Sequence, residues 1–380
     1  MHDVAIAGAG PVGATLALAL ADTDLDVVAL DARAPGEIAR GDRSLALSHG
    51  ARLILERLRV WGPLSARTGA ITPITAIDVS QARGFGSTRI DAREQRLPAL
   101  GYVVSYRALQ AALDDALACA GVAVRYGARV TRVEPGSEQA RVFLDHGDDP
   151  LTARLAVAAD GAGGIAGLSR ERRDYGQVAI VASLWTDPPH AGVAYERFTP
   201  DGPVALLPER DHYGLVWTRT PDDAARVLAL SDEDFLCALA RHFGGRVRGF
   251  ARVAERRSFP LVLEYAEPPI APCVAAIGNA AQALHPIAGQ GFNLGLRDAH
   301  ELARLIAATA RESLGSAAML ARYARSRALD RRAGIAFTDG LVQLFGGEAL
   351  RWPRGLGLAM LDTMPPLKRA FTRAMLYGWR

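Results

Sequence analysis

Cysteine and lysine are both scarce in this chain of 380 residues. The three cysteines, Cys119, Cys237 and Cys273, include no C-x-x-C pair. An odd number without paired spacing argues against a disulfide framework, so we expect a protein of the reducing cytoplasm. Lys368 is the only lysine among 44 basic residues, and the formal net charge is +3. Because no basic tract is interleaved with aromatic residues, the sequence argues against nucleic-acid binding.

Long apolar runs are missing as well. No run reaches the roughly 18 residues that a membrane-spanning helix needs. The apolar N-terminus has no basic region before it and is interrupted by Gly-x-Gly-Pro, so we do not interpret it as a signal peptide. The sequence contains no Ser-His-Asp set, HExxH motif or Cys/His metal spacing, and we predict no metal site. Its 49% hydrophobic and 22% charged residues are ordinary for a soluble enzyme.

The N-terminal segment has the pattern of a dinucleotide cradle. A short apolar strand leads into glycines spaced G-x-G-x-x-G, then an Ala/Leu-rich helix, then a second strand that ends in an acid. Such glycines permit a tight turn, bring the backbone close to a pyrophosphate and let the helix pack on the strand, and the acid suits a ribose. The pattern favours a dinucleotide over a plain βαβ unit without choosing between NAD and FAD. The residues concerned are Gly8, Gly10, Pro11, Val12, Gly13 and Asp31.

Two later strands end in a short polar side chain beside a glycine. One apolar run ends at Asp160 and Gly161, the other at Gly278 and Asn279. Such side chains can bind hydroxyl groups or a ribityl chain at the carboxyl ends of parallel strands. Taken alone, each pair is more often a plain turn.

Residues 284–299, LHPIAGQGFNLGLRDA, carry glycines on both sides of Gln290 and then continue into a helical pattern. Such glycines let backbone N–H groups approach a flat ring, and the helix N-terminus directs a positive dipole at it. The alternative is a glycine-rich helix entry that binds nothing. His285 is a candidate general base, although a lone histidine beside a proline is more often structural.

The sequence thus carries three fingerprints. The first is Gly8-x-Gly10-x-x-Gly13, the second is Asp160-Gly161, and the third is Gly278-Asn279 with the glycine-rich segment 284–299 that follows it. Together they resemble those of the class A flavoprotein aromatic hydroxylases, the family of para-hydroxybenzoate hydroxylase. Residues 41–61, 195–208 and 278–298 resemble its ubiquinone-biosynthesis branch, and most of all the 2-octaprenyl-6-methoxyphenol hydroxylases. The resemblance extends over nearly the whole chain. Asn279 departs from the wider class, which has an aspartate there; asparagine still bonds a ribityl hydroxyl but brings no charge.

The resemblance implies an α/β fold with a Rossmann-like FAD-binding domain of the GR2 type, an inserted antiparallel β-sheet substrate domain and a C-terminal helical region. We expect residues 1–75, 95–175 and 268–345 in a discontinuous FAD-binding domain, 76–94 and 176–267 in the β-rich substrate domain, and 346–380 in a helical tail. The tail mixes apolar and basic residues. We therefore hypothesise that it docks on a membrane surface; the alternative is a helical cap or a contact with another protein.

The resemblance also implies an activity. One FAD, reduced by transiently bound NAD(P)H, would use O₂ to hydroxylate the ring of a polyprenylated phenol of the 2-polyprenyl-6-methoxyphenol type in ubiquinone biosynthesis. Such a protein would be cytoplasmic, with peripheral contact to the inner face of the membrane and with other proteins of that pathway. The alternatives are a hydroxylase of a soluble phenol with the same fold and a non-catalytic flavoprotein subunit of a biosynthetic complex. A flavin halogenase is disfavoured, because its W-x-W-x-I-P motif is absent.

Further cofactor-binding residues follow from matched positions in that family. Arg43 and Arg107 are expected to contact the flavin or its phosphates, although a solvated arginine is the alternative for each. The remaining positions would surround the ribityl chain and the ring; they are Asp160, Gly278, Asn279, Pro286, Gly289, Gln290, Gly291, Phe292 and Asn293.

Overall fold

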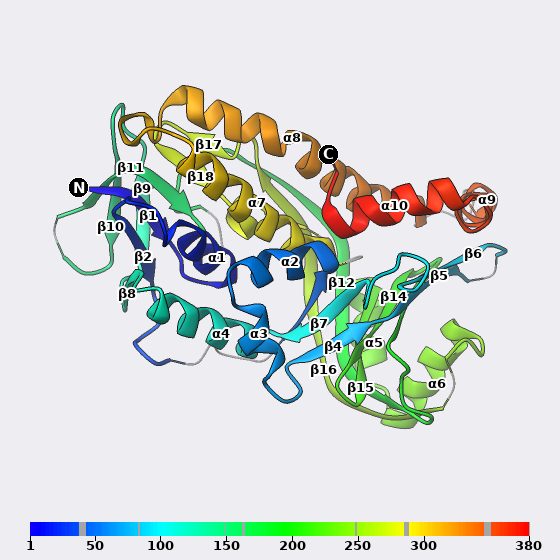
Figure 1. Ribbon diagram of the computed structural model, residues 1–380. Coiled ribbons are helices and arrows are strands. Elements are labelled where there is room, and N and C mark those ends of the chain that lie inside the picture. Colours follow the sequence, from blue (N-terminus) through cyan, green and yellow to red (C-terminus); the bar gives the residue numbers. More distant parts are fainter. Residues whose placement is uncertain are drawn as a thin grey trace.

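The computed structural model describes residues 1–37, 43–82, 84–147, 149–161, 164–247, 249–284, 289–345 and 351–379. These residues form three sheets and the helices that cover them. The N-terminus lies at one end of the molecule, in a sheet covered by helices, and a large open sheet forms the other end (Figure 1).

The first sheet contains the predicted strand-helix-strand unit. Its parallel strands have the order β18-β11-β1-β2-β8; β17 is antiparallel at one edge, and β9 and β10 extend antiparallel from β11. The helices α1 (Pro11–Leu20), α4 (Tyr106–Cys119) and α7 (Gln290–Ala307) pack on one face, and β9 and β10 on the other. Because both faces are covered there, the central strands β1, β2, β11 and β18 are mostly apolar. The strands are β1 (His2–Ala7), β2 (Val27–Asp31), β8 (Ala123–Tyr126), β9 (Val130–Glu134), β10 (Ala140–Leu144), β11 (Leu151–Ala158), β17 (Ile270–Ala271) and β18 (Val274–Ala276).

The second sheet has the order β19-β16-β12-β15-β14-β13-β5-β6. It is antiparallel, as expected, except that β5 and β13 run parallel. A parallel pair needs a long connection, and more than a hundred residues of chain separate these two strands. How the chain divides into domains stays a prediction. The strands are β5 (Ala76–Gln81), β6 (Ser87–Asp91), β12 (Arg170–Thr186), β13 (Val193–Thr199), β14 (Gly202–Glu209), β15 (His212–Arg219), β16 (Phe250–Ala266) and β19 (Gln282–Ala283).

Two helices that the sequence reading did not predict cover one face of the second sheet, α5 (Pro221–Leu228) and α6 (Asp232–Phe243). Their start and stop signals are present. Thr220 caps α5 and Ser231 caps α6, each side chain accepting a backbone N–H of the first turn. Gly244 ends α6 in the left-handed conformation.

A small third sheet connects the other two. Its strands, in the order β3-β7-β4, are β3 (Ser44–Ser48), β7 (Gly101–Ser105) and β4 (Ile71–Ile74). Two short helices follow β3, α2 (His49–Arg57) and α3 (Trp61–Ser65). Ile74 and Val103 of this sheet pack against Ala194 of β13. The third sheet therefore lies on the face of the second sheet that α5 and α6 leave open.

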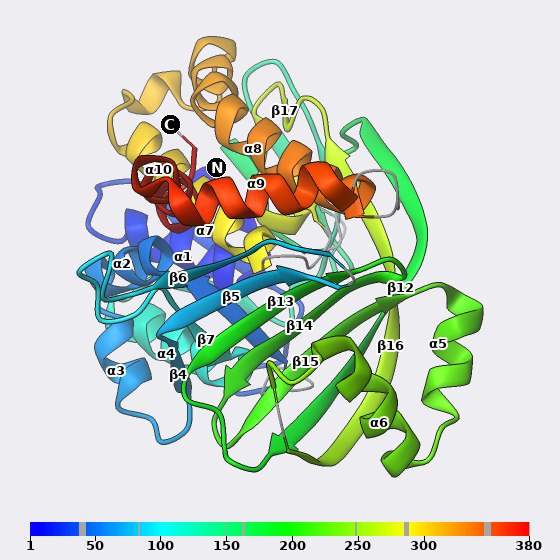
Figure 2. The same ribbon diagram turned by 90° about the vertical axis from the view of Figure 1, so that its right-hand side faces the viewer.

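The C-terminal part of the chain is helical. It contains α8 (Ala317–Phe345), α9 (Arg351–Thr363) and α10 (Pro365–Tyr377). Figure 2 shows α9 lying across the edge of the second sheet near β6. Among helices of the described residues, none is both long enough and apolar enough to cross a membrane. Two short 3-10 turns complete the described structure, η1 (Gly278–Ala280) and η3 (Arg311–Ser313).

Candidate functional site

The turn after β1 lies directly against the end of β11. Gly8 has a φ of +107°, and a Cβ at this position would lie 2.6 Å from the Ala159 carbonyl oxygen. A Cβ on Gly13 would lie 1.9 Å from the Gly8 carbonyl oxygen. The first and second fingerprints therefore meet, and the protein itself requires glycine at both positions.

Gly10 is different, because packing within the protein does not explain it. A Cβ there would have no atom of the described residues within 4 Å, and its φ of −63° suits any residue. It begins α1 without a side-chain hydrogen bond among those residues, so the first N–H groups of the helix are available to a ligand. A phosphate that passes close to the backbone accounts for a glycine here. The cradle therefore fits the pyrophosphate of a dinucleotide.

Asp31 ends β2, as predicted, and is buried. One of its carboxylate oxygens accepts the Ala9 N–H at 3.0 Å, and the other accepts the Arg33 N–H at 2.8 Å. The Arg33 guanidinium also pairs with Asp31 at 3.1 Å and with Asp114 of α4 at 2.9 Å. Burial by itself would lower the pKa of Arg33, but its bonds to the two carboxylates raise that pKa above its ordinary value. Arg33 therefore fixes the position of the Asp31 carboxylate, which is expected to bind a ribose.

The pairing of Arg33 with both Asp31 and Asp114 was not predicted from the sequence. Gln110 also belongs to this network, because its side chain donates to the Ala9 carbonyl at 3.0 Å and to Asp114 at 2.8 Å. A basic residue two positions after Asp31 was the only local signal. The carboxylate that pairs with Arg33 comes from a helix 81 residues away, and the sequence does not reveal that pairing.

Arg43 and Arg107 come together at the start of α4. The Arg43 guanidinium lies 4.6 Å from the centre of the Tyr106 ring, and the Tyr106 N–H donates to the Arg43 carbonyl at 2.9 Å. Both arginine side chains are exposed. Both side chains are therefore accessible to an anion bound at this end of α4.

The third fingerprint also reaches the cradle. Gly278 has a φ of +60°, and a Cβ there would lie 3.2 Å from both methyl groups of Val12. A Cβ on Gly295 of α7 would lie 2.9 Å from the Gly278 Cα. Asn279 is exposed, although both of its neighbours in the turn are buried. The backbone is thus packed tightly around Gly278, while the Asn279 amide stays open to a ligand. Asp160 of the second fingerprint is partly exposed.

The start of α7 is joined to the third sheet. Gly289 caps the helix in the left-handed conformation with a φ of 58°, and a Cβ there would lie 2.8 Å from the Ala46 Cβ. Buried Asn293 accepts the Ser48 N–H at 2.8 Å and donates to the carbonyls of Ala46 at 2.9 Å and Gly289 at 2.8 Å. The protein uses all of its amide's hydrogens. Asn293 therefore contributes to a site by holding the helix start in place.

The first turn of α7 consists of Gln290, Gly291 and Phe292, all partly exposed. The N-cap residue, Gly289, has no side chain that could cap this turn, and the N-terminus of a helix carries the positive end of its dipole. His285 and Pro286, the other two candidates in this segment, lie outside the described residues.

A buried network of charged side chains holds the turn at Gly278, part of the third fingerprint, in place. Asp298 of α7 is 0% exposed; it accepts the Gly278 N–H at 3.3 Å, the Gln282 amide at 2.6 Å and the Arg327 Nε at 2.7 Å. Arg327 also pairs with Asp330 at 2.7 Å. Burial would lower the pKa of Arg327, but the two carboxylates raise it.

The described residues contain no group of three or more His, Cys, Asp or Glu side chains that could hold a metal ion. The site consists instead of glycines without room for side chains, two open helix N-termini and isolated polar groups. It suits an extended ligand with phosphates at one end and a flat, electron-accepting ring at the other.

Substitution of Asn293 by alanine should lower the free energy of unfolding by about 2 kcal/mol, because three buried backbone groups lose their partner. Urea unfolding measures this effect. Asn279→Ala is the matched control: its side chain is exposed, so its effect should stay within about 0.5 kcal/mol. Equal effects of the two substitutions would contradict the bracing role of Asn293.

Comparison with known proteins agrees with this geometry. A family model described as an FAD binding domain matches residues 1–338. The ubiquinone hydroxylase UbiL of Rhodospirillum rubrum is 34% identical over 384 residues, covering 98% of this chain and 88% of the relative. The 3-demethoxyubiquinol 3-hydroxylase of Escherichia coli is 29% identical over 384 residues, covering 97% of this chain and 96% of the relative.

The fold also has solved counterparts. The structure of Klebsiella pneumoniae HpxO complexed with FAD and uric acid is similar with a TM-score of 0.75 and 19% identity, covering 99% of this chain and 97% of that one. The α/β architecture and the FAD cofactor that the sequence predicted are thereby confirmed. The roles of the individual site residues stay predictions.

Proposed function

This chain belongs to the FAD-binding domain family, and from that premise we propose that it is an FAD-dependent monooxygenase. It uses NAD(P)H and O₂ to hydroxylate the ring of a polyprenylated phenol, of the 2-polyprenyl-6-methoxyphenol type, in ubiquinone biosynthesis. The names of the relatives from R. rubrum and E. coli, both ubiquinone-pathway hydroxylases, support this substrate class. The observation that carries the proposal is the close packing of the three fingerprints: Gly8 lies against Ala159, and Gly278 lies against Val12 and against Gly295 of α7.

Bound FAD would supply the redox chemistry that activates O₂. The residues of the chain would bind and orient it. Gly8, Gly10 and Gly13 approach the pyrophosphate, Asp31 bonds the adenosine ribose, and Asn279 bonds the ribityl chain. The start of α7 would lie against the ring, where the positive end of its dipole would favour negative charge.

The decisive experiment supplies FAD-loaded protein with NADPH or NADH, O₂ labelled with ¹⁸O and a short-chain 2-methoxy-6-prenylphenol. We expect one labelled oxygen atom in the product, detected by mass spectrometry. If only soluble phenols are hydroxylated, the substrate class is wrong. If the protein retains FAD but transfers no oxygen to any phenol, the alternative of a non-catalytic subunit holds. Metabolite profiling of a deletion strain should show the accumulated quinone precursor.

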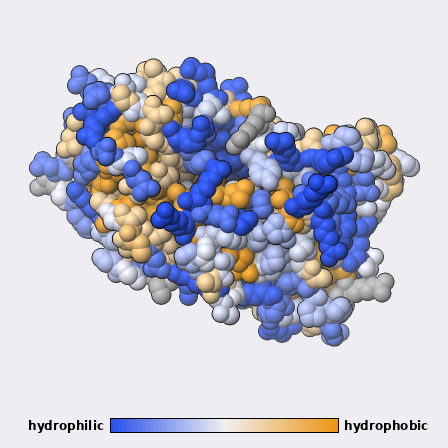
Figure 3. All heavy atoms as spheres, in the orientation of Figure 1, coloured by the Kyte–Doolittle hydropathy of each residue, from blue (hydrophilic) through white to orange (hydrophobic). Residues whose placement is uncertain are grey.

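We also propose that the C-terminal helices dock on an anionic membrane, where a polyprenylated substrate resides. The outward face of α9 and the start of α10 carry a row of exposed apolar side chains, each 43% to 67% exposed, which we call the α9 stripe. Within α9, spacing by four residues places Trp352, Leu356 and Met360 on one side of the helix. Met364 caps α10, and Leu367 lies in its first turn. Figure 3 shows apolar and strongly hydrophilic residues together at this end of the molecule. The α9 stripe consists of Trp352, Leu356, Met360, Met364 and Leu367.

Charge favours an anionic bilayer as the surface that covers the α9 stripe. Asp362 is the only acid after residue 350, whereas Arg369 and Arg373 of α10 are exposed and basic. An apolar face flanked by arginine is typical of an interfacial helix. Phe85 of the β5–β6 turn extends the apolar surface, with its ring centre 5.3 Å from that of Trp352.

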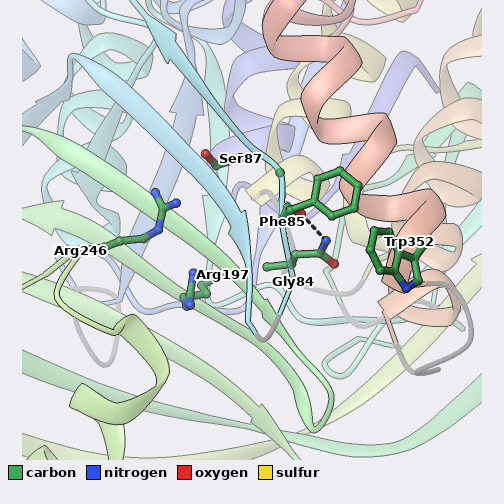
Figure 4. Close-up of a pocket in the computed structure, with 8 residues that line it drawn as sticks. Gly84, Phe85, Ser87, Arg197, Arg246 and Trp352 are labelled. Carbon is green, nitrogen blue, oxygen red and sulfur yellow. Dashed lines mark hydrogen bonds between the residues drawn. The ribbon is translucent and has the colours of Figure 1, made fainter.

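A pocket of about 610 Å³ opens beside this surface (Figure 4). The two guanidinium groups of Arg197 and Arg246 make it polar, so we do not assign the prenyl chain to it. In the docked protein it would face the lipid headgroups. Its lining residues are Gln81, Gly84, Phe85, Gly86, Ser87, Arg197, Arg246 and Trp352.

The double substitution Leu356→Glu and Met360→Glu should weaken binding to vesicles containing phosphatidylglycerol by at least about tenfold, because it removes apolar area and adds negative charge. Vesicle flotation measures the bound fraction. The matched control places the same two charges on exposed positions of α6, Cys237→Glu and Ala240→Glu, and should bind like the unaltered chain. Unchanged binding of the α9 variant would contradict membrane docking. So would the finding that the unaltered chain is a dimer in solution and that the α9 variant is a monomer, because the α9 stripe would then be covered by a second copy.

A further inference from the structure

The two faces of the second sheet have different surroundings. One face packs on α5 and α6 in a buried apolar core. The other face is partly exposed at alternate positions of its strands, including Val79 of β5, Ala205 of β14 and Val216 of β15. Because successive side chains of a strand point to opposite faces, these apolar residues form an accessible surface on the side of the third sheet.

Glu196 lies in the middle of this apolar face; Glu209, at the end of β14 on the same face, is paired with His212 at 3.8 Å. The neighbours of Glu196 in β13 point the other way: Tyr195 contacts the Phe243 ring of α6, and Arg197 donates to the His242 carbonyl. Ala194, two residues before Glu196 and on the same face, packs against Val103 of the third sheet. The Glu196 side chain therefore points to the accessible face, away from α5 and α6.

The immediate surroundings of Glu196 are apolar. Its partners in the adjacent strands are Val79 and Ala205, and Ala194 and Phe198 flank it along β13. Within the described residues, its carboxylate has no hydrogen bond or ion pair and no charged group that acts on its ionisation. The nearest charged pair, Asp78 with Arg246, belongs to the opposite face, since Asp78 alternates with Val79 in β5. Arg197 likewise faces α6.

A carboxyl group in such apolar surroundings loses its proton at a higher pH than a carboxyl group in water. Burial raises the pKa of Glu196 from its ordinary value of 4.5 to about 7. Part of its surface nevertheless stays accessible. Because part of the Glu196 side chain is accessible on this face of the sheet, a small molecule can reach it there.

A short series of contacts joins this face to the start of α7. The Gly289 backbone lies against Ala46, whose Cβ is 2.8 Å from the position of a Gly289 Cβ. Ala46 pairs with Val103 in the third sheet. Val103 packs on Ala194, which shares its face with Glu196. The apolar face is therefore connected to the start of α7, which is assigned to the flavin ring, by packing through the paired strands β3 and β7.

We propose that Glu196 bonds the phenol hydroxyl of the substrate and accepts its proton as the ring is hydroxylated. This inference rests on the proposed function. The phenol O–H bond breaks, the proton passes to a Glu196 carboxylate oxygen, and the electron pair stays on the phenol oxygen and enriches the ring. One atom of O₂ becomes the new hydroxyl oxygen, and the other leaves as water, formed with the two electrons of NAD(P)H and two protons. Loss of the ring hydrogen as a proton then restores aromaticity. Glu196 returns its proton to the phenol oxygen of the product.

The chemistry needs a base of this kind. A phenol loses its proton with a pKa of about 10, so an ordinary carboxylate is too weak to accept that proton readily. A carboxylate with a pKa closer to that of the phenol transfers the proton at lower cost. The apolar surface around Glu196 suits the remainder of a prenylated ring.

Glu196→Gln is the first test, because it keeps the shape of the side chain and removes its ionisation. Turnover of 2-methoxy-6-prenylphenol by FAD-loaded protein should fall by about 10² to 10⁴, with KM changed less than about threefold. In the unaltered chain kcat should rise with pH through about 7, as the base ionises. This rise of kcat with pH, the limb of the pH profile that we assign to Glu196, should be absent in Glu196→Gln and present again in Glu196→Asp. The control Glu171→Gln, at an exposed position of β12, should keep the limb.

Binding without turnover separates this inference from the proposed function. Quenching of bound-flavin fluorescence gives the affinity for 2-methoxy-6-prenylphenol and for its methyl ether, which has no proton to donate. We expect the unaltered chain to prefer the phenol by at least about tenfold and Glu196→Ala to lose that preference. A preference unchanged in Glu196→Ala, or a pH limb unchanged in Glu196→Gln, overturns the role of Glu196 even if hydroxylation occurs. Binding with the expected preference but without oxygen transfer overturns the hydroxylase assignment alone, whereas absence of binding to the unaltered chain overturns both.

Discussion

Gly10→Val should leave the protein folded but unable to retain FAD. The valine side chain would meet no atom of the described residues within 4 Å of its Cβ, and the φ of −63° is ordinary for it. The side chain would enter the space through which the pyrophosphate approaches the backbone. We expect the affinity for FAD to fall by at least about a hundredfold, which corresponds to about 2.8 kcal/mol.

Two measurements on each variant test this prediction. Urea unfolding of the flavin-free protein reports stability, and fluorescence titration with FAD reports affinity. Gly13→Ala is the matched comparison, because its Cβ would lie 1.9 Å from the Gly8 carbonyl oxygen. It should lose about 3 kcal/mol of stability even without FAD. If Gly10→Val instead binds FAD as tightly as the unaltered chain, the pyrophosphate does not pass this turn.

Arg327→Met should destabilise the protein by about 3 to 5 kcal/mol, the usual cost of removing one partner from a buried ion pair. Asp298 and Asp330 would lose their shared cation in the interior, where both are less than 3% exposed. Burial by itself would raise the pKa of Asp330, but Arg297 and Arg327 together hold it below its ordinary value. The stability lost in Arg327→Met should partly return on acidification, since protonation of the stranded carboxyls removes their charge.

Urea unfolding at pH 7 and at pH 5 measures both parts of this prediction. Arg304→Met is the matched control; Arg304 lies on α7, is exposed, and pairs with Glu301 three residues earlier at 3.0 Å. Its effect should stay within about 0.5 kcal/mol. A similarly small effect of Arg327→Met would mean that water or another group compensates the buried acids. Because Asp298 also accepts the Gly278 N–H, we expect FAD affinity to fall together with stability.

The sequence by itself determined the parts of this protein that contiguous residues encode. The strand, the glycine turn, the helix and Asp31 follow one another within about thirty residues, and their conformational demands are local. Short runs of β-forming residues between Pro, Gly and Asp turns in residues 176–267 likewise predicted a β-rich region. The three separated fingerprints indicated the family, because each carries its own turn chemistry.

Only the tertiary structure decided which distant groups meet. Asn293 bonds Ser48 across 245 residues and Arg33 bonds Asp114 across 81; no local pattern records such a pairing. The parallel pairing of β5 with β13 depends on where a long connection returns. Which face of β13 holds Glu196 was settled by the docking of α5 and α6 on the other side. A strand pattern gives the alternation of side chains, but burial on one face, and hence the ionisation of Glu196, depends on what packs there.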